Sequence, residues 1–106
     1  MRVVRILAEA ANEAAEAAAW YESERQGLGE EFERAIDAAL DLLEEDIVPP
    51  TPAVGVAARK LGANRLMLRR FPYDIVVRER HDEIIVIAFA HHAGRPGYWR
   101  KRVPRT

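Results

Sequence analysis

Apolar and polar positions follow a helical period in the middle of this chain. Six large apolar residues recur three or four positions apart, namely Leu28, Phe32, Ile36, Leu40, Leu43 and Ile47. Most of the positions between them are charged, so the pattern predicts an amphipathic helix with one buried face. The proline-rich sequence that starts at Pro49 cannot continue a helix and must end it.

A second helix is predicted on the N-terminal side of the first. Residues 8–25 are rich in alanine and glutamate, which are strong helix formers. Small residues repeat in it at helical spacing, namely Ala8, Ala11, Ala15 and Ala18. Gly27 and Gly29 lie between the two helices, where a chain reversal needs flexible backbone. The two segments therefore predict an antiparallel helical hairpin.

Short runs of β-branched and apolar residues predict four strands, at residues 2–7, 64–71, 74–80 and 83–90. The element order is therefore β-α-α-β-β-β. We predict an α+β fold of two layers, in which the helical hairpin packs on one face of an antiparallel sheet with strand order 1-4-3-2. The segment from Pro49 to Ala63 is predicted to be a loop, and it is long for a compact domain.

Alternation along the strands predicts which side chains face the helices. We expect the larger apolar residues to do so, namely Ile85, Ile87, Phe89, Ile75, Val77, Leu66 and Leu68. The opposite face then carries Arg65, Met67, Arg69, Val76, Arg78 and Arg80 and continues to His92. One open face of the sheet is thus predicted to hold four arginines near a histidine.

Length and composition predict one domain that spans residues 1–106. Cysteine is absent, which excludes disulfides and suits a reducing compartment. No stretch approaches the roughly 18 apolar residues of a membrane helix, and the first residues do not resemble a signal peptide. We therefore expect a soluble, cytoplasmic protein without a membrane partner.

Charge is distributed unevenly along the chain. Residues 1–58 carry four basic and thirteen acidic residues, a net charge of −9, whereas residues 59–106 carry twelve basic and four acidic residues, a net charge of +8. Either the protein has one acidic and one basic face, or the two halves neutralise each other within the fold.

The predicted arginine face is the strongest candidate for chemistry. Planar guanidinium groups match the oxygens of phosphates and carboxylates. Four arginines that converge on one face would suit a polyanion. An ordinary surface role, with ion pairs to neighbouring carboxylates, is the alternative for the arginines.

The two adjacent histidines do not predict a metal site. Neighbouring residues on a strand point to opposite faces, so His91 and His92 cannot hold one ion together. No cluster of histidines and carboxylates has ligand spacing, and we expect neither a metal nor another cofactor. His91 is expected to bond the backbone, and Tyr98 with Trp99 to fasten the C-terminal tail rather than stack on a base.

Several short motifs occur together in a fixed order between residues 3 and 102. They are Trp20-Tyr21-Glu22, Gly27-Leu28-Gly29-Glu30-Glu31-Phe32, Arg70-Phe71-Pro72-Tyr73, the apolar run 84–90, and His91 with Arg95-Pro96 and Tyr98-Trp99. In this order they resemble the RelE/ParE toxins of bacterial type II toxin–antitoxin systems, which include plasmid-stabilisation proteins. The long helices and the net charge of −1 bring the chain closer to the ParE branch.

The resemblance implies a toxin that stops growth until a cognate antitoxin neutralises it in a hetero-oligomeric complex. ParE-like members inhibit DNA gyrase by binding, whereas RelE-like members cleave mRNA on the ribosome, and this second activity stays open as the alternative. For that alternative the resemblance implies arginines that stabilise the transition state and a histidine or tyrosine that transfers protons, and the candidates are Arg65, Arg69, Arg78, His91, His92 and Tyr98. A family member that has lost its toxicity is a third possibility. All three imply an antitoxin whose acidic C-terminal segment folds on contact. We expect it to bind Arg65, Arg69, Arg78, Arg80, Trp20 and Tyr21.

Overall fold

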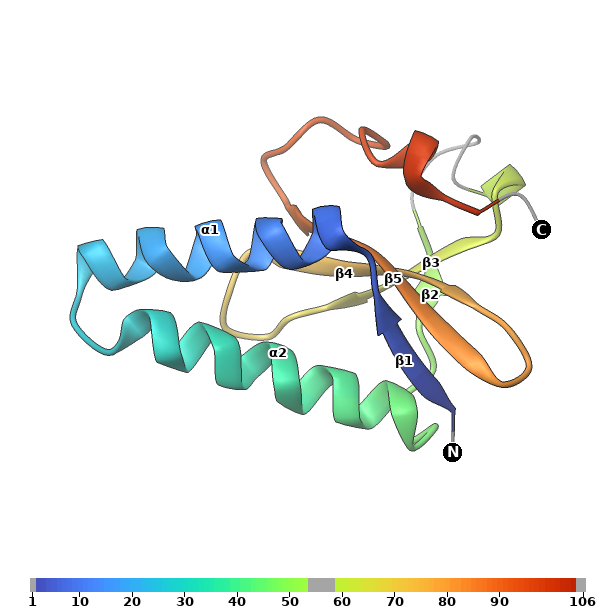
Figure 1. Cartoon of the computed structure of the whole chain (residues 1–106), viewed down its shortest axis with the longest axis horizontal. Helices are drawn as coiled ribbons and strands as arrows, with labels where there is room; N and C mark the ends of the chain where they lie inside the picture. The colour runs from blue at the N-terminus through green and yellow to red at the C-terminus, as the bar shows by residue number, and fades with distance from the viewer. Residues whose placement is uncertain (1, 54–58, 105–106) are drawn as a thin grey trace.

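The computed structural model describes residues 2–53 and 59–104 as two layers, a helical hairpin and a sheet (Figure 1). The elements are β1 (Val3–Ile6), α1 (Ala8–Glu24), α2 (Leu28–Glu44), β2 (Thr51–Pro52), β3 (Ala63–Met67), β4 (Tyr73–Glu79), β5 (Glu83–His91) and the short 3₁₀ helix η1 (Arg100–Arg102). The α+β class and the helical hairpin on one face of the sheet are confirmed. No helix among the described residues is long and apolar enough to cross a bilayer.

The sheet has five strands in the order β1-β5-β4-β3-β2. Without β2 this is the predicted order. Two details differ from the prediction. β1 runs parallel to β5, which the chain allows because the connection between them is long and contains the helical hairpin and three strands. β2 lies inside the segment predicted to be a loop and pairs with β3; residues 54–58 of that segment lie outside the described residues.

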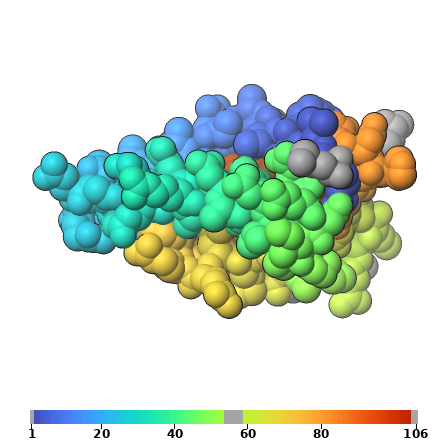
Figure 2. All heavy atoms as spheres, turned by 90° about the horizontal axis from the view of Figure 1, so that it is seen from below, coloured from blue at the N-terminus to red at the C-terminus, as the bar shows by residue number. Residues whose placement is uncertain are grey.

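The predicted apolar stripe of α2 is buried almost as expected. Phe32, Ile36 and Leu43 are buried, and Leu28 and Leu40 pack against the same core. The exception is Ile47, which is 60% exposed because the helix ends at Glu44, before this residue is reached. Seen from below, α2 lies between α1 and the turn that connects β3 with β4 (Figure 2).

α1 does not bury the predicted set of alanines. Of that set only Ala18 is buried, and the other buried alanines are Ala10 and Ala17. Ala18 lies where the two helices approach most closely. A Cβ on Gly29 would meet the backbone oxygen of Ala18 at 2.5 Å, so the contact requires glycine at this position of α2.

The sheet carries an apolar core on each face. On the helix side it contributes Leu68, Phe71, Ile75, Val77, Ile84, Val86 and Phe89. The core on the other face consists of Ala53, Ala63, Val76, Ile85, Ile87, Ala88, Trp99 and Val103. The predicted helix-side positions of Leu66, Leu68, Ile75, Val77 and Phe89 are confirmed.

Ile85 and Ile87 lie on the opposite face from the one predicted. The cause is a β-bulge in β5: Val76 pairs with Ala88 but Val77 pairs with Val86, which leaves Ile87 without a partner on β4. One extra residue reverses the alternation on its N-terminal side. Ile85 and Ile87 therefore face away from the helices, while Phe89 beyond the bulge keeps its predicted side.

The C-terminal tail, residues 93–104, crosses the sheet face that the helices leave free (Figure 1). Trp99 is 4% exposed and Val103 is 5% exposed, because both fill the second core. The prediction that this face is open was therefore wrong, and the prediction that Trp99 fastens the tail is confirmed. What stays accessible on this face is a groove beside the tail.

Candidate functional site

A groove of about 390 Å³ lies between the tail and the sheet, on the side away from the helices. We call it the tail groove. Its apolar walls come from Ala53, Met67, Val76, Ala90, Pro96 and Trp99. Its polar side chains are Arg65, Asp74, His91, His92, Arg95 and Tyr98. Apolar walls with mostly basic side chains beside them suit a partner that carries both apolar and acidic groups.

Asp74 organises the polar side of the tail groove. Arg65 on β3 donates from Nη1 to Asp74 Oδ2 at 3.2 Å. His92, just after β5, places Nε2 2.9 Å from Asp74 Oδ1. The Nε atom of Arg65 is buried and has no hydrogen-bond partner within the described part of the chain. One carboxylate thus orients both a guanidinium and an imidazole, and the Nε donor of Arg65 remains unpaired.

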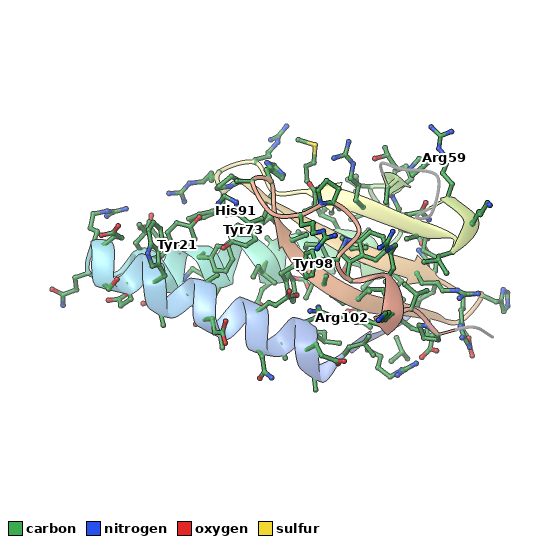
Figure 3. The ribbon with its side chains drawn as sticks, turned by 90° about the horizontal axis from the view of Figure 1, so that it is seen from above. Tyr21, Arg59, Tyr73, His91, Tyr98 and Arg102 are labelled. Carbon is green, nitrogen blue, oxygen red and sulfur yellow. The ribbon has the colours of Figure 1, made fainter. Side chains whose placement is uncertain are left out.

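Glu13 of α1 holds the tail in place through hydrogen bonds to two of its side chains. Its carboxylate accepts hydrogen bonds from the Tyr98 hydroxyl and from Arg102, whose Nη1 lies 2.9 Å from Oε1. It also accepts one from the backbone N–H of Phe89 at 3.1 Å. Arg102 donates in addition to the carbonyl of Ile87, the residue that the bulge leaves unpaired. Figure 3 shows Tyr98 and Arg102 over β5 on the α1 side.

The environment of Tyr98 affects the chemistry that its hydroxyl can do. Burial and, after it, the hydrogen bond to Glu13 raise the pKa of Tyr98 well above its ordinary value. The phenol therefore stays protonated at neutral pH, with its proton directed at Glu13. In this arrangement Tyr98 does not serve as a general base.

The four predicted arginines do not converge on one site. Arg65 lines the tail groove, and Arg78 lies on the same sheet face but donates to the carbonyl of Pro104 in the tail. Arg69 is exposed in the turn that follows β3. Arg80 lies at the other end of β4, in a separate charged pocket. Whether any of them binds a partner stays a prediction.

The aromatic residues predicted to meet a partner differ in exposure. Trp20 is 58% exposed and lines a shallow groove of about 350 Å³ beside α1. Tyr21 packs against Phe32 and Phe71, with ring centroids 5.1 and 5.0 Å away. Trp20 is therefore accessible to a partner, whereas Tyr21 mainly supports the helix-side core.

His91 has the backbone bond that was predicted for it. Its Nδ1 accepts from the N–H of Ala93 at 2.9 Å, and its ring packs edge-on against Tyr73. The side chain is exposed rather than covered by the tail. It lies between the tail groove and the shallow groove beside α1, and lines both (Figure 3).

Sequence reasoning missed the two carboxylates that organise this region. Asp74 stands alone among arginines at the start of a strand, and that isolated charge was a usable signal. Glu13 is one of several glutamates in α1, and nothing in the sequence distinguishes it from the others. Within residues 2–53 and 59–104, no group of three or more histidines and carboxylates is placed to hold a metal ion.

Comparison with known proteins shows a likeness in fold. No protein-family model and no curated protein matches the chain. Among solved structures, it is similar to a chain described as "Chromosomal ParDE TA system from P. aeruginosa", with a TM-score of 0.62. The two chains share a fold. The likeness covers 86% of this chain and 96% of that one, at 16% sequence identity, so it carries the architecture and not the identity of individual site residues.

Proposed function

We propose that this protein is the ParE-like toxin of a type II toxin–antitoxin system and that it acts by binding its target. The fold shared with a chain of the ParDE system carries the proposal. The ordered motifs in the sequence support it independently, since they point to the same family. Cytoplasmic action is part of the proposal, because the expected target is DNA gyrase.

The hydrogen bonds that the candidate catalytic groups already make favour action by binding over catalysis. Tyr98 is bonded to Glu13 with a raised pKa, and Arg78 is bonded to the tail carbonyl of Pro104. Arg69 and Arg80 are not among the residues that line the tail groove. The groove therefore keeps Arg65 and the two histidines but not the full set of candidates for phosphodiester cleavage, whereas its apolar walls suit association with a protein.

The antitoxin is proposed to occupy the tail groove with an acidic segment. Carboxylates of that segment would pair with Arg65 and Arg95, which line the groove, while apolar side chains would contact its apolar walls. Arg69, in the turn before β4, and Arg80, directly after β4, would contact parts of the antitoxin segment that extend beyond the groove. Arg78 would join it only if the tail moved, because its guanidinium holds Pro104.

One observation favours mRNA cleavage as the second candidate function. His92, Asp74 and Arg65 form a contiguous cluster in the tail groove. A carboxylate that orients an imidazole is a common general acid–base arrangement, and a guanidinium beside it can stabilise a phosphorane. His92 would transfer the proton and Arg65 would bind the phosphate.

Controlled expression followed by two assays separates the candidates. Growth arrest that is relieved by an antitoxin encoded beside this chain is expected for any active toxin. The purified protein is then tested for inhibition of gyrase supercoiling and for cleavage of ribosome-bound mRNA. We expect loss of supercoiling with intact message. Cleavage that disappears in His92→Ala, with supercoiling unaffected, would replace our proposal with the nuclease.

The placement of the antitoxin has its own test. Arg65→Glu should weaken antitoxin binding and reduce its salt sensitivity, because a cation of the groove becomes an anion beside Asp74. Arg34→Glu is the matched control, since it makes the same charge change on the outer surface of α2. An unchanged dissociation constant and salt dependence in Arg65→Glu would refute the placement.

A further inference from the structure

A second group of cations lies outside the tail groove, where the tail meets the start of β3. Arg100 and Lys101 belong to η1, and Arg59 and Lys60 are helical residues at the start of the turn that leads into β3. All four side chains are exposed. We call these four residues the basic tail surface.

The second core holds the two segments of the basic tail surface close to each other. Leu61, which directly follows Lys60, packs against the cluster that contains Trp99 and Val103, the residues on either side of η1. The N–H of Gly62 bonds to the carbonyl of Arg59 at 3.1 Å and closes the turn. Figure 1 shows this turn and η1 near each other at the upper right, and in Figure 3 Arg59 points away from the molecule.

The charges of this surface are available for a ligand. Among the described residues, none of the four forms an ion pair with a carboxylate, whereas the neighbouring Arg102 pairs with Glu13. The sequence from Ile84 to Thr106 contains no acidic residue. The helices carry most of the acidic residues, so the molecule is an electric dipole that would turn the tail toward a polyanion.

We propose that the basic tail surface binds the phosphate backbone of duplex DNA without regard to sequence. Closely spaced exposed cations match the regular negative charge of a duplex. Trp99 is buried, and Tyr98, although 39% exposed, lines the tail groove and is not part of the basic tail surface, so this surface offers no aromatic ring for base stacking. The basic tail surface is therefore expected to contact the phosphates of the duplex rather than its bases.

The exposed side chains make duplex DNA a better ligand than a membrane. Among the described residues, the large apolar side chains that are most exposed are Val3, Ile6, Trp20, Ile47, Met67 and Tyr98, and of these only Tyr98 lies near η1, where it lines the tail groove. Membrane binding by an interfacial segment needs such residues beside its cations. The choice of DNA over RNA rests on the proposed function, because gyrase works on duplex DNA.

Fluorescence anisotropy with a short labelled DNA duplex and no gyrase tests the proposal separately from the toxin assignment. If the four cations each contact a phosphate, the logarithm of the binding constant falls against the logarithm of salt concentration with a slope of about −3 to −4. Arg100→Glu with Lys101→Glu should raise the dissociation constant at least about tenfold and reduce that slope by about two. Arg59→Glu with Lys60→Glu should act in the same way.

The matched control is Arg25→Glu with Arg34→Glu, which makes the same charge change on the helical hairpin. We expect it to alter the dissociation constant less than about twofold, apart from long-range effects that salt screens. An equal loss in the control would mean that only net charge matters and would overturn the proposal. So would tighter binding to an RNA duplex, to vesicles of anionic lipid or to polyglutamate. Arg100→Gln with Lys101→Gln, checked by circular dichroism, guards against loss of folding in the charge-reversal variants.

Discussion

The two faces of the sheet are covered in different ways. On one face, two helices of 17 residues each supply a continuous apolar core with large aromatic side chains. On the other, a short tail covers a smaller core and leaves a polar groove beside it. The helix side therefore carries most of the stability, whereas the tail side combines local packing with accessible polar groups and carries the candidate function.

Phe32→Ala should have the largest effect, because it removes a fully buried ring from the helix-side core. Phe32 is 0% exposed and packs against Tyr21, Phe71 and Tyr73 at centroid distances of 5.1 Å. We expect the free energy of unfolding to fall by about 3–5 kcal/mol in urea denaturation. Trp20→Ala, which changes an exposed ring on the same hairpin, should cost less than about 0.5 kcal/mol. Similar losses in both variants would contradict the comparison.

Trp99→Ala should release the tail without unfolding the rest. Its ring is buried in the second core, and we expect a loss of about 3 kcal/mol, the lower end for a buried aromatic ring, that is confined to the tail side. Hydrogen exchange should accelerate at Arg102 and Val103, whose amides bond within the tail, and stay unchanged in α2. Faster exchange throughout both helices would show that the two faces do not open separately.

Glu13→Gln tests the link between the two faces. The substitution removes the charge that Tyr98 and Arg102 share, and hydrogen bonds to charged groups contribute about 1.5–3 kcal/mol each. Because both partners are partly exposed, we expect a net loss of about 1–2 kcal/mol with a loosened tail. Glu16→Gln on the same helix is the control and should leave tail exchange unchanged. A tail that stays protected in Glu13→Gln would contradict the proposed link.

The smallest effect should appear only in alkali. Burial raises the pKa of Tyr98 in the folded protein, so the folded state keeps this proton after the unfolded chain has lost it. The contribution of Tyr98 to the free energy of unfolding is fully present below about pH 10, the ordinary tyrosine pKa. It declines as the pH rises above that value. Tyr98→Phe should therefore show a shallower alkaline decline in denaturation curves. An identical decline in wild type and variant would contradict the assigned environment of Tyr98.

The buried face of a helix could be predicted only where large apolar residues and polar residues occupy distinct helical positions in the sequence. In α2, large apolar residues stand against carboxylates, and the buried stripe follows from their spacing. In α1, alanines occur on every side, so composition does not mark the buried face and three of the four predicted alanines are exposed. The length of each helix was easier to predict than the orientation of α1.

On the sheet, alternation predicted side-chain directions only up to an irregularity. The bulge at Ile87 reversed the predicted side of Ile85 and Ile87, and no glycine or proline in β5 signals it. The tail groove was predictable in part: Arg65 and His92 lie in it as expected, beside Asp74. The shape of the groove depends on how Trp99 and Glu13 position the tail. These residues contact parts of the chain that are distant in sequence, and such contacts produce no periodic pattern from which they could be predicted.

Inhibition of gyrase supercoiling by three purified forms of the chain tests the central claim most directly. The claim is that this chain inhibits its target by binding, and that the tail groove, where the antitoxin is proposed to bind and block the toxin, is also the surface that meets the target. Wild type and Arg34→Glu should inhibit supercoiling equally, while Arg65→Glu should lose most inhibition although it remains folded. Equal inhibition by all three forms, or no inhibition by wild type, would contradict the claim.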